Sequence, residues 1–129
     1  FSLLSLQAYP ALLTALLCRR SNARNLTLQV AKELSALACA ASPPAFFHTR
    51  TCIETLVRHL RLRAADEMVL CHLAIALDRL ATDSETCRLL LSSSGLPRVV
   101  VPQLLRATLS VRTVFLRLVE LCYRARRAA

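Results

Sequence analysis

Six cysteines and three histidines are the residues that could bind a metal ion or supply a nucleophile in this chain of 129 residues. Zinc sites usually take paired ligands, such as two cysteines with two residues between them. No two cysteines here are closer than the 13 residues that separate Cys39 from Cys52. We therefore expect no metal site, and free thiols that lie mostly on buried helix faces in a reducing compartment. The cysteines are Cys18, Cys39, Cys52, Cys71, Cys87 and Cys122.

The acidic residues give no pattern for acid–base catalysis. Asp66 and Glu67 precede a helical segment, where carboxylates cap a helix N-terminus. The single glycine cannot form a phosphate-binding loop, and the chain has neither a G-x-S-x-G nor an H-E-x-x-H motif. The sequence therefore predicts no catalytic residues, no cofactor and a protein that is not an enzyme.

The charge of the chain favours an acidic partner. The formal net charge is +9, and all of the 17 basic residues except Lys32 are arginines. Arginine makes planar, forked contacts to carboxylates and phosphates, so an acidic peptide, nucleic acid or an anionic surface could bind. The arginines are spread along the whole chain, and the alternative is therefore a solvated outer surface with no binding role.

The composition predicts an all-α protein. The chain is 55% hydrophobic and contains one glycine, so strong helix formers dominate. The first 18 residues carry no charge, but we expect Pro10 to break them into two short helices, which excludes a membrane span. The length fits one domain over residues 1–129. Because the chain begins with Phe1 and not with methionine, we expect a piece of a longer protein.

Two helical patterns recur along the chain. Segments 10–19, 54–63 and 98–107 each predict a short apolar helix, and a longer helix follows each of them. Leucines recur in the short helices every 44 residues, at Leu16, Leu60 and Leu104. In the longer helices they recur after 43 and 41 residues, at Leu34, Leu77 and Leu118. A period of roughly 42 residues lies in the range of helical repeats, and the units are approximately 1–40, 41–82 and 83–124.

A still shorter helix opens each unit and is clearest in the third. Ser84 or Asp83 can cap it, and Gly95 can supply the positive φ that ends it. Pro97 then suits the first turn of the next helix. In the second unit, "PPAFFHTR" at 43–50 fills this place, and Arg50–Thr51 stand where the third unit has its glycine. In the first unit, "FSLLSLQ" at 1–7 takes the place of this helix.

The order of capped helix, Gly-Leu-Pro joint, apolar helix and long helix resembles the armadillo repeat family, over nearly the whole chain as about three repeats. The first two units lack the glycine, which leaves a two-helix, HEAT-like arrangement open. The resemblance implies a right-handed α-solenoid whose stacked third helices line a concave groove. The alternative is an irregular helical bundle with no true repeat.

The resemblance also implies where a partner would bind. Aligned positions on the third helices give the candidate groove residues Lys32, His72, Ile75, Arg79, Arg112, Leu116 and Glu120. Armadillo proteins that carry nuclear localisation signals use a tryptophan and an asparagine four residues apart on these helices, and this chain has no tryptophan. We therefore expect an acidic or amphipathic peptide in a groove of mixed apolar and basic character. For Arg79 the alternative is a structural ion pair with Asp78 or Asp83.

These expectations favour a non-enzymatic scaffold in the cytoplasm or nucleus that binds a partner protein. One alternative is a nucleic-acid-binding repeat, although the aromatic residues do not interleave with the basic ones as stacking platforms would. Another is a segment that regulates a larger enzyme. An incomplete first repeat would also leave an apolar end, so we expect self-association through Phe1, Leu3, Leu4 and Leu6.

Overall fold

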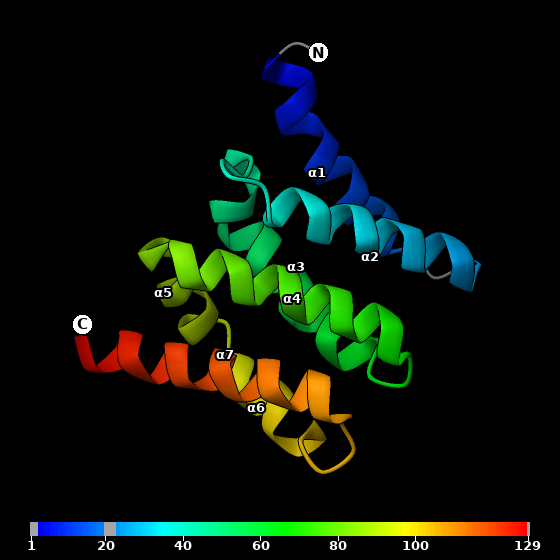
Figure 1. Cartoon of the computed structure of the whole chain (residues 1–129). Coiled ribbons are helices and arrows are strands. Elements are labelled where there is room, and N and C mark those ends of the chain that lie inside the picture. The colour runs from blue at the N-terminus through cyan, green and yellow to red at the C-terminus, as the bar shows by residue number, and fades with distance from the viewer. Residues whose placement is uncertain (1–2, 20–22, 129) are drawn as a thin grey trace.

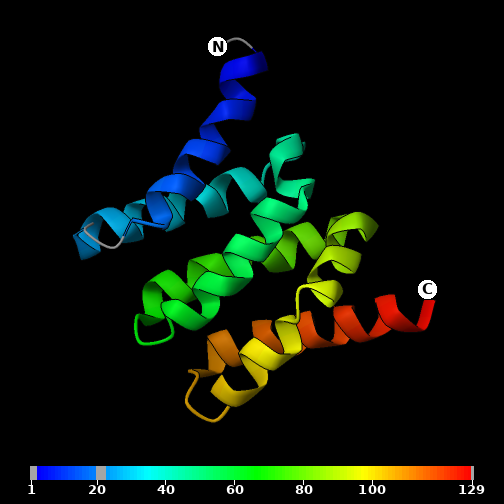
Figure 2. The ribbon, with the colours of Figure 1, turned by 180° about the vertical axis from the view of Figure 1, so that it is seen from behind.

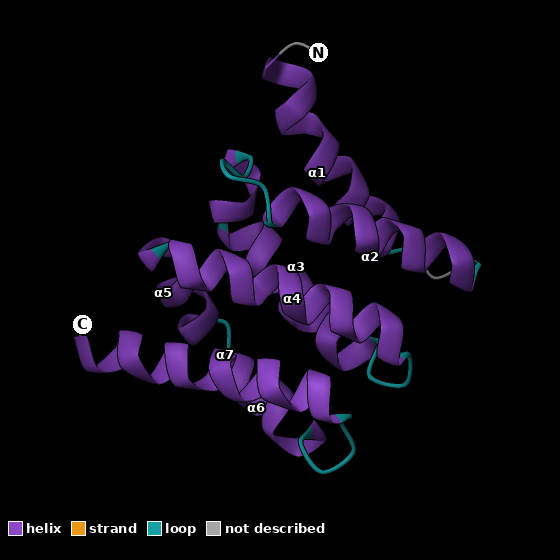
Figure 3. Cartoon of the chain, viewed as in Figure 1, coloured by secondary structure: helices purple, strands orange, loops and turns teal. Residues whose placement is uncertain are grey.

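The structure is a computed structural model that describes residues 3–19 and 23–128, without the side chains of residues 3–8 and 128. Every regular element in this part of the chain is helical, so the prediction of an all-α protein is confirmed (Figure 3). The elements are α1 (Leu3–Leu17), α2 (Arg24–Ala38), η1 (Ala45–His48), α3 (Arg50–Leu62), α4 (Glu67–Asp83), α5 (Glu85–Ser93), α6 (Leu96–Val100), η2 (Val101–Gln103) and α7 (Leu109–Ala128).

The helices form two layers. Helices α2, α4 and α7 lie side by side and run in the same direction, with α4 in the middle (Figure 1). Helices α1, α3, α5 and α6 lie behind them, as the opposite view shows (Figure 2). The long helix of each predicted unit is therefore in the same layer.

Helix starts and the glycine joint follow the local sequence signals. Thr49, Asp66 and Ser84 cap α3, α4 and α5, because each side-chain oxygen accepts a hydrogen bond from a backbone N–H three residues on, at 3.2–3.3 Å. Gly95 has φ 78° and precedes α6, and Pro97 lies in the first turn of that helix. The predicted cap at Ser84 and joint at Gly95 are confirmed.

The core follows the leucine pattern of the long helices. Leu34, Leu77 and Leu118 are completely buried, and each of these helices also buries a small residue one helical turn further on. Those small residues are Ala38, Ala81 and Cys122. The pattern of the shorter helices is weaker, since Leu60 is buried and its counterparts Leu16 and Leu104 are only partly so.

The predicted break at Pro10 is wrong, because α1 runs through this residue as one helix. Proline removes one backbone donor, which costs about 3 kcal/mol in a helix interior. Pro10 is buried and the following turns bury Leu13 and Leu17 against the rest of the core, which favours a continuous helix. The hydroxyl of Thr14 donates to the Pro10 carbonyl at 2.8 Å.

Two further boundaries differ from the prediction. Segment 98–107 is not one helix, because α6 ends at Val100 and is followed only by the 3-10 turn η2. Pro102 lacks the N–H that would continue the helical hydrogen bonds. In the second unit, Arg50–Thr51 already belong to α3, and the extended residue Thr49 makes the joint instead. The basic segment 123–128 continues α7.

We expect the substitution Gly95→Ala to lower the free energy of unfolding by about 1 kcal/mol, because an L-residue is strained at this positive φ. No atom lies within 4 Å of the position that a Cβ would take, so the backbone alone causes the loss. Gly95→Asn should lose less, since asparagine tolerates this conformation. Chemical denaturation measures both values, and equal stability of all three proteins would contradict the assignment.

Candidate partner-binding surface

One face of helix α4 stays open to solvent in the described part of the chain. Met68, His72, Ile75 and Arg79 recur at helical spacing along it, and all four are exposed or half-buried. The opposite face of α4 carries Leu77 and the rest of the buried leucines. Three of the candidate residues, His72, Ile75 and Arg79, therefore share one stripe of α4.

The neighbouring long helices present further candidates in the same way. Lys32 is exposed on α2, on the side opposite the buried Leu34. Leu116 and Glu120 are exposed on α7, one helical turn apart. The three helices are parallel neighbours (Figure 1), and we call the exposed and half-buried candidates on them the outward face. Its members are Lys32, His72, Ile75, Arg79, Leu116 and Glu120.

Titratable side chains of neighbouring long helices lie close together at the outward face and beside it. Lys32 of α2 acts electrostatically on His72 of α4, and burial together with this charge lowers the pKa of His72. On the other side of α4, Asp78 pairs with Arg117 of α7 at 3.3 Å. The Asp78–Arg117 pair thus supports the contact of α4 with α7 in addition to the core.

Two candidate residues are tied within their own helices. Arg79 pairs with Asp83 at 3.1 Å, as the structural alternative anticipated, and Glu120 accepts from Arg124 at 2.7 Å. Both are exposed pairs separated by one helical turn. Such pairs contribute only about 0.3–0.5 kcal/mol, so a partner can exchange them for its own contacts.

Arg112 has a different environment from the other candidates. Its guanidinium donates to the carbonyl oxygens of Leu104 and Ala107, each at 3.0 Å. These contacts fasten the segment between η2 and α7 to the first turn of α7. Arg112 therefore faces this segment and does not belong to the outward face.

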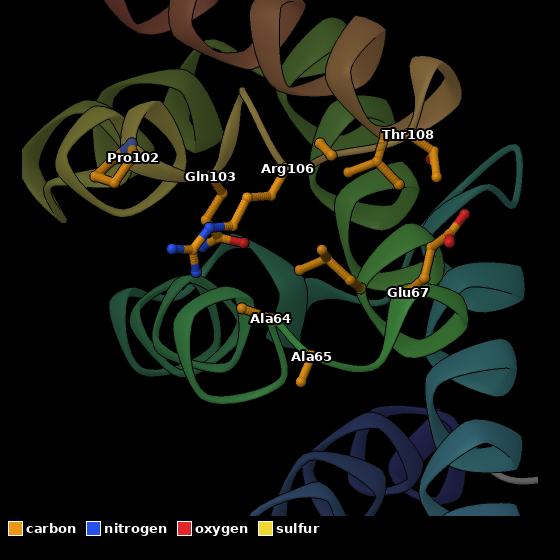
Figure 4. Close-up of a pocket in the computed structure, with 10 residues that line it drawn as sticks. Ala64, Ala65, Glu67, Pro102, Gln103, Arg106 and Thr108 are labelled. Carbon is orange, nitrogen blue, oxygen red and sulfur yellow. The ribbon is translucent and has the colours of Figure 1, made fainter.

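A pocket that the sequence did not predict lies where the α3–α4 turn meets the segment before α7 (Figure 4). It has a volume of about 620 Å³. Arg106 and Gln103 lie on one side of it and Glu67 on the other. The amide of Gln103 donates to the carbonyls of Leu60 and Val99, which fixes that wall. The remaining lining is mainly apolar and includes Ala64, Ala65, Leu70, Pro102, Ala107 and Val111.

The sequence also did not predict two contacts between a cysteine and a histidine. Cys18 Sγ lies 3.4 Å from His59 Nε2, and Cys87 Sγ lies 3.3 Å from His48 Nδ1. The partners are 41 and 39 residues apart, which is close to one repeat period. Their separation by about one period is the only signal in the sequence, and it does not by itself distinguish a contact from chance.

Among the described residues, neither pair belongs to a cluster that could hold a metal ion. Within residues 3–19 and 23–128, no cluster of three or more His, Cys, Asp or Glu side chains is arranged to hold a metal ion. Cys52, Cys87 and Cys122 are buried and Cys71 is half-buried, whereas Cys18 and Cys39 are exposed. The expectation of buried thiols is thus met for three of these six residues and in part for Cys71.

The helices of the described chain include none whose length and apolar character would suffice to cross a membrane. The residues expected to mediate self-association, Phe1, Leu3, Leu4 and Leu6, lie outside the described residues and side chains.

No protein-family model, curated protein or solved structure matches the chain. The likeness to armadillo repeats therefore depends on the sequence pattern and on the order of the helices.

We predict that the ion pair of Asp78 and Arg117 responds unequally to removal of its members. Burial raises the pKa of Asp78, and the charges of Arg117 and Arg79 partly offset this rise. Asp78 Oδ1 has no hydrogen-bond partner within the described chain. Because the folded pKa lies above the unfolded one, the charged carboxyl opposes folding at neutral pH. Asp78→Asn should therefore not lower the free energy of unfolding, whereas Arg117→Gln should lower it by about 1–2 kcal/mol. Equal losses in urea denaturation would contradict this.

We also predict that His59 makes the protein sensitive to acid. Burial, followed by the charges of Arg63 and Arg58, lowers the pKa of His59 to about 4. The unfolded chain, with an ordinary pKa of about 6.5, binds more protons between these two values. The free energy of unfolding should therefore fall by up to about 3 kcal/mol as pH drops through this range. His59→Gln should reduce this slope in denaturation at several pH values, and parallel curves would refute the prediction.

Proposed function

We propose that the chain is a non-enzymatic interaction module, a right-handed α-solenoid of about three armadillo-like repeats that binds a partner protein across its outward face. One observation carries this proposal. Three parallel neighbouring helices (Figure 1) expose apolar and basic side chains on faces that point away from their buried leucines. Repeat proteins use such stacked helices as extended binding surfaces.

The outward face has the chemistry of a peptide-binding surface. Ile75 is 36% exposed and Leu116 is 52% exposed, so both leave apolar area for a partner to cover. Lys32 and Arg79 flank this area with positive charge and can pair with carboxylates of the partner. An amphipathic segment with acidic residues on one side fits this combination.

Acidic residues on the outward face and paired with it favour a peptide over nucleic acid. Glu120 and Asp83 lie beside the apolar and basic side chains, and each already pairs with an arginine. A continuous phosphate backbone that crossed this face would meet both carboxylates, whereas a peptide can place neutral or basic residues there. Unpaired thiols at all six cysteines agree with a module that works in the reducing cytoplasm or nucleus.

A peptide selection followed by matched variants tests this proposal. Acidic amphipathic peptides are selected from a displayed library on the full chain, and their Kd is measured by fluorescence anisotropy. Ile75→Ser with Leu116→Ser should raise the Kd at least about tenfold, because two apolar contacts are lost. Leu62→Ser with Leu89→Ser removes exposed apolar side chains outside the outward face and is the control.

Equal weakening by both double variants would refute the assignment of the outward face. Failure to select any peptide, together with tight, strongly salt-dependent binding of a short DNA or RNA duplex, would favour the nucleic-acid alternative. Thermal denaturation of each variant first establishes that the serines leave the protein folded.

A further inference from the structure

Cys18 is an exposed thiol with two nitrogen groups facing its sulfur. It directly follows the last residue of α1 and contacts the C-terminal half of α3. Its Sγ lies 3.4 Å from His59 Nε2 and 3.7 Å from an Nη atom of Arg58. Both groups can donate hydrogen bonds, and a thiolate accepts them better than a neutral thiol does.

The buried imidazole of His59 is arranged to donate to this sulfur. The residue is only 3% exposed, and its Nδ1 has no hydrogen-bond partner among the described residues. A hydrogen on Nδ1 would be buried without an acceptor, whereas a hydrogen on Nε2 points to the sulfur of Cys18. The tautomer with its hydrogen on Nε2 is therefore favoured. Since the pKa of His59 is about 4, the ring stays neutral at neutral pH and acts as a donor.

The surroundings of Cys18 are positive. Within the described chain, no carboxylate pairs with Arg19, Arg58 or Arg63. The end of α1 would oppose a negative sulfur through its free carbonyl groups. Arg63 reduces this effect, because its guanidinium donates to the Leu17 carbonyl at 3.0 Å.

We propose that Cys18 is a redox-modification site that undergoes thiol–disulfide exchange with small anionic disulfides of the glutathione type. The Cys18 thiolate attacks one sulfur of the disulfide, and a new S–S bond forms as the old one breaks. The departing sulfur takes the bonding electron pair and a proton from water. Cys18 is thereby oxidised, the departing thiol is reduced, and Arg58 and Arg19 attract the carboxylates of the reagent.

The other cysteines of the chain provide contrasts. Cys39 is also exposed, but no histidine or arginine contacts its sulfur in the described structure. Cys87 does contact His48, but it is completely buried, and burial raises its pKa. A comparison of Cys18 with Cys39 therefore isolates the effect of the neighbouring histidine and arginine, because both thiols are exposed. A comparison with Cys87 isolates the effect of exposure, because both thiols contact a histidine.

The adduct would also change the structure locally. Cys18 lies between α1 and α3, and its bond to a bulky anionic group would separate the sulfur from His59 and Arg58. We therefore expect modification to loosen the contact of α1 with α3 while α4 and its neighbours stay in place.

The test compares the cysteines within one protein. The full chain reacts with glutathione disulfide at neutral pH, remaining thiols are alkylated at set times, and mass spectrometry gives the rate for each cysteine. Cys18 should react at least about tenfold faster than Cys39. With cystamine, a cationic disulfide, this ratio should fall several-fold because the arginines repel the reagent.

Two arginine variants with equal net charge separate a local effect from a general one. Arg58→Met should slow the reaction of Cys18 several-fold, whereas Arg61→Met on the same helix should leave it unchanged. Arg58→Lys should restore part of the rate, since it keeps the charge. The proposal is overturned if Cys18 and Cys39 react equally fast, if the two disulfides give the same ratio, or if the two methionine variants behave alike.

Discussion

Packing around α4 is the interaction on which the other parts of the structure depend. This helix contacts α2 on one side and α7 on the other, and it also packs on α3 and α5 behind it. Its inner face is apolar throughout, with Leu73, Leu77 and Leu80 essentially buried. Buried alanines at Ala74 and Ala81 let neighbouring helices approach closely. Without α4, neither α2 nor α7 would have its main neighbour.

This packing also decides what the surface can do. Helices α2 and α7 lie parallel to α4 (Figure 1). Each of these helices buries leucines on one side and exposes other side chains on the opposite side, among them Lys32, Ile75 and Leu116. The ion pair of Asp78 with Arg117 lies beside this surface and links α4 to α7.

Local signals in the sequence predicted the helix starts well. Ser84, Asp66 and Gly95 act through their own side chain or backbone freedom, so their role does not depend on distant residues. Pro10 and Pro102 show the limit of such signals. Pro10 lies inside the continuous helix α1, whereas Pro102 lies just after the end of α6. The outcomes differ because packing against distant residues decides whether a lost hydrogen bond is tolerated.

Helix periodicity in the sequence predicted which candidate residues are exposed but not which groups they contact. Periodicity placed Ile75 and Leu116 correctly on exposed helix faces, since exposure alternates with the buried leucines. It could not show that Arg112 binds backbone carbonyls, because that depends on the path of the preceding segment. The pocket beside Arg106 and the contact of Cys18 with His59 join segments from different units, which a linear pattern does not place in space.

Native-state hydrogen exchange, followed residue by residue by NMR, tests the central role of α4 most directly. If α4 holds the layers together, the amides of Leu73, Leu77 and Leu80 exchange only through global unfolding, and α1 opens at lower free energy. The account predicts that the amides of α4 do not exchange while the amides of α2 and α7 remain protected from exchange. Exchange of α4 ahead of both neighbours would contradict the account.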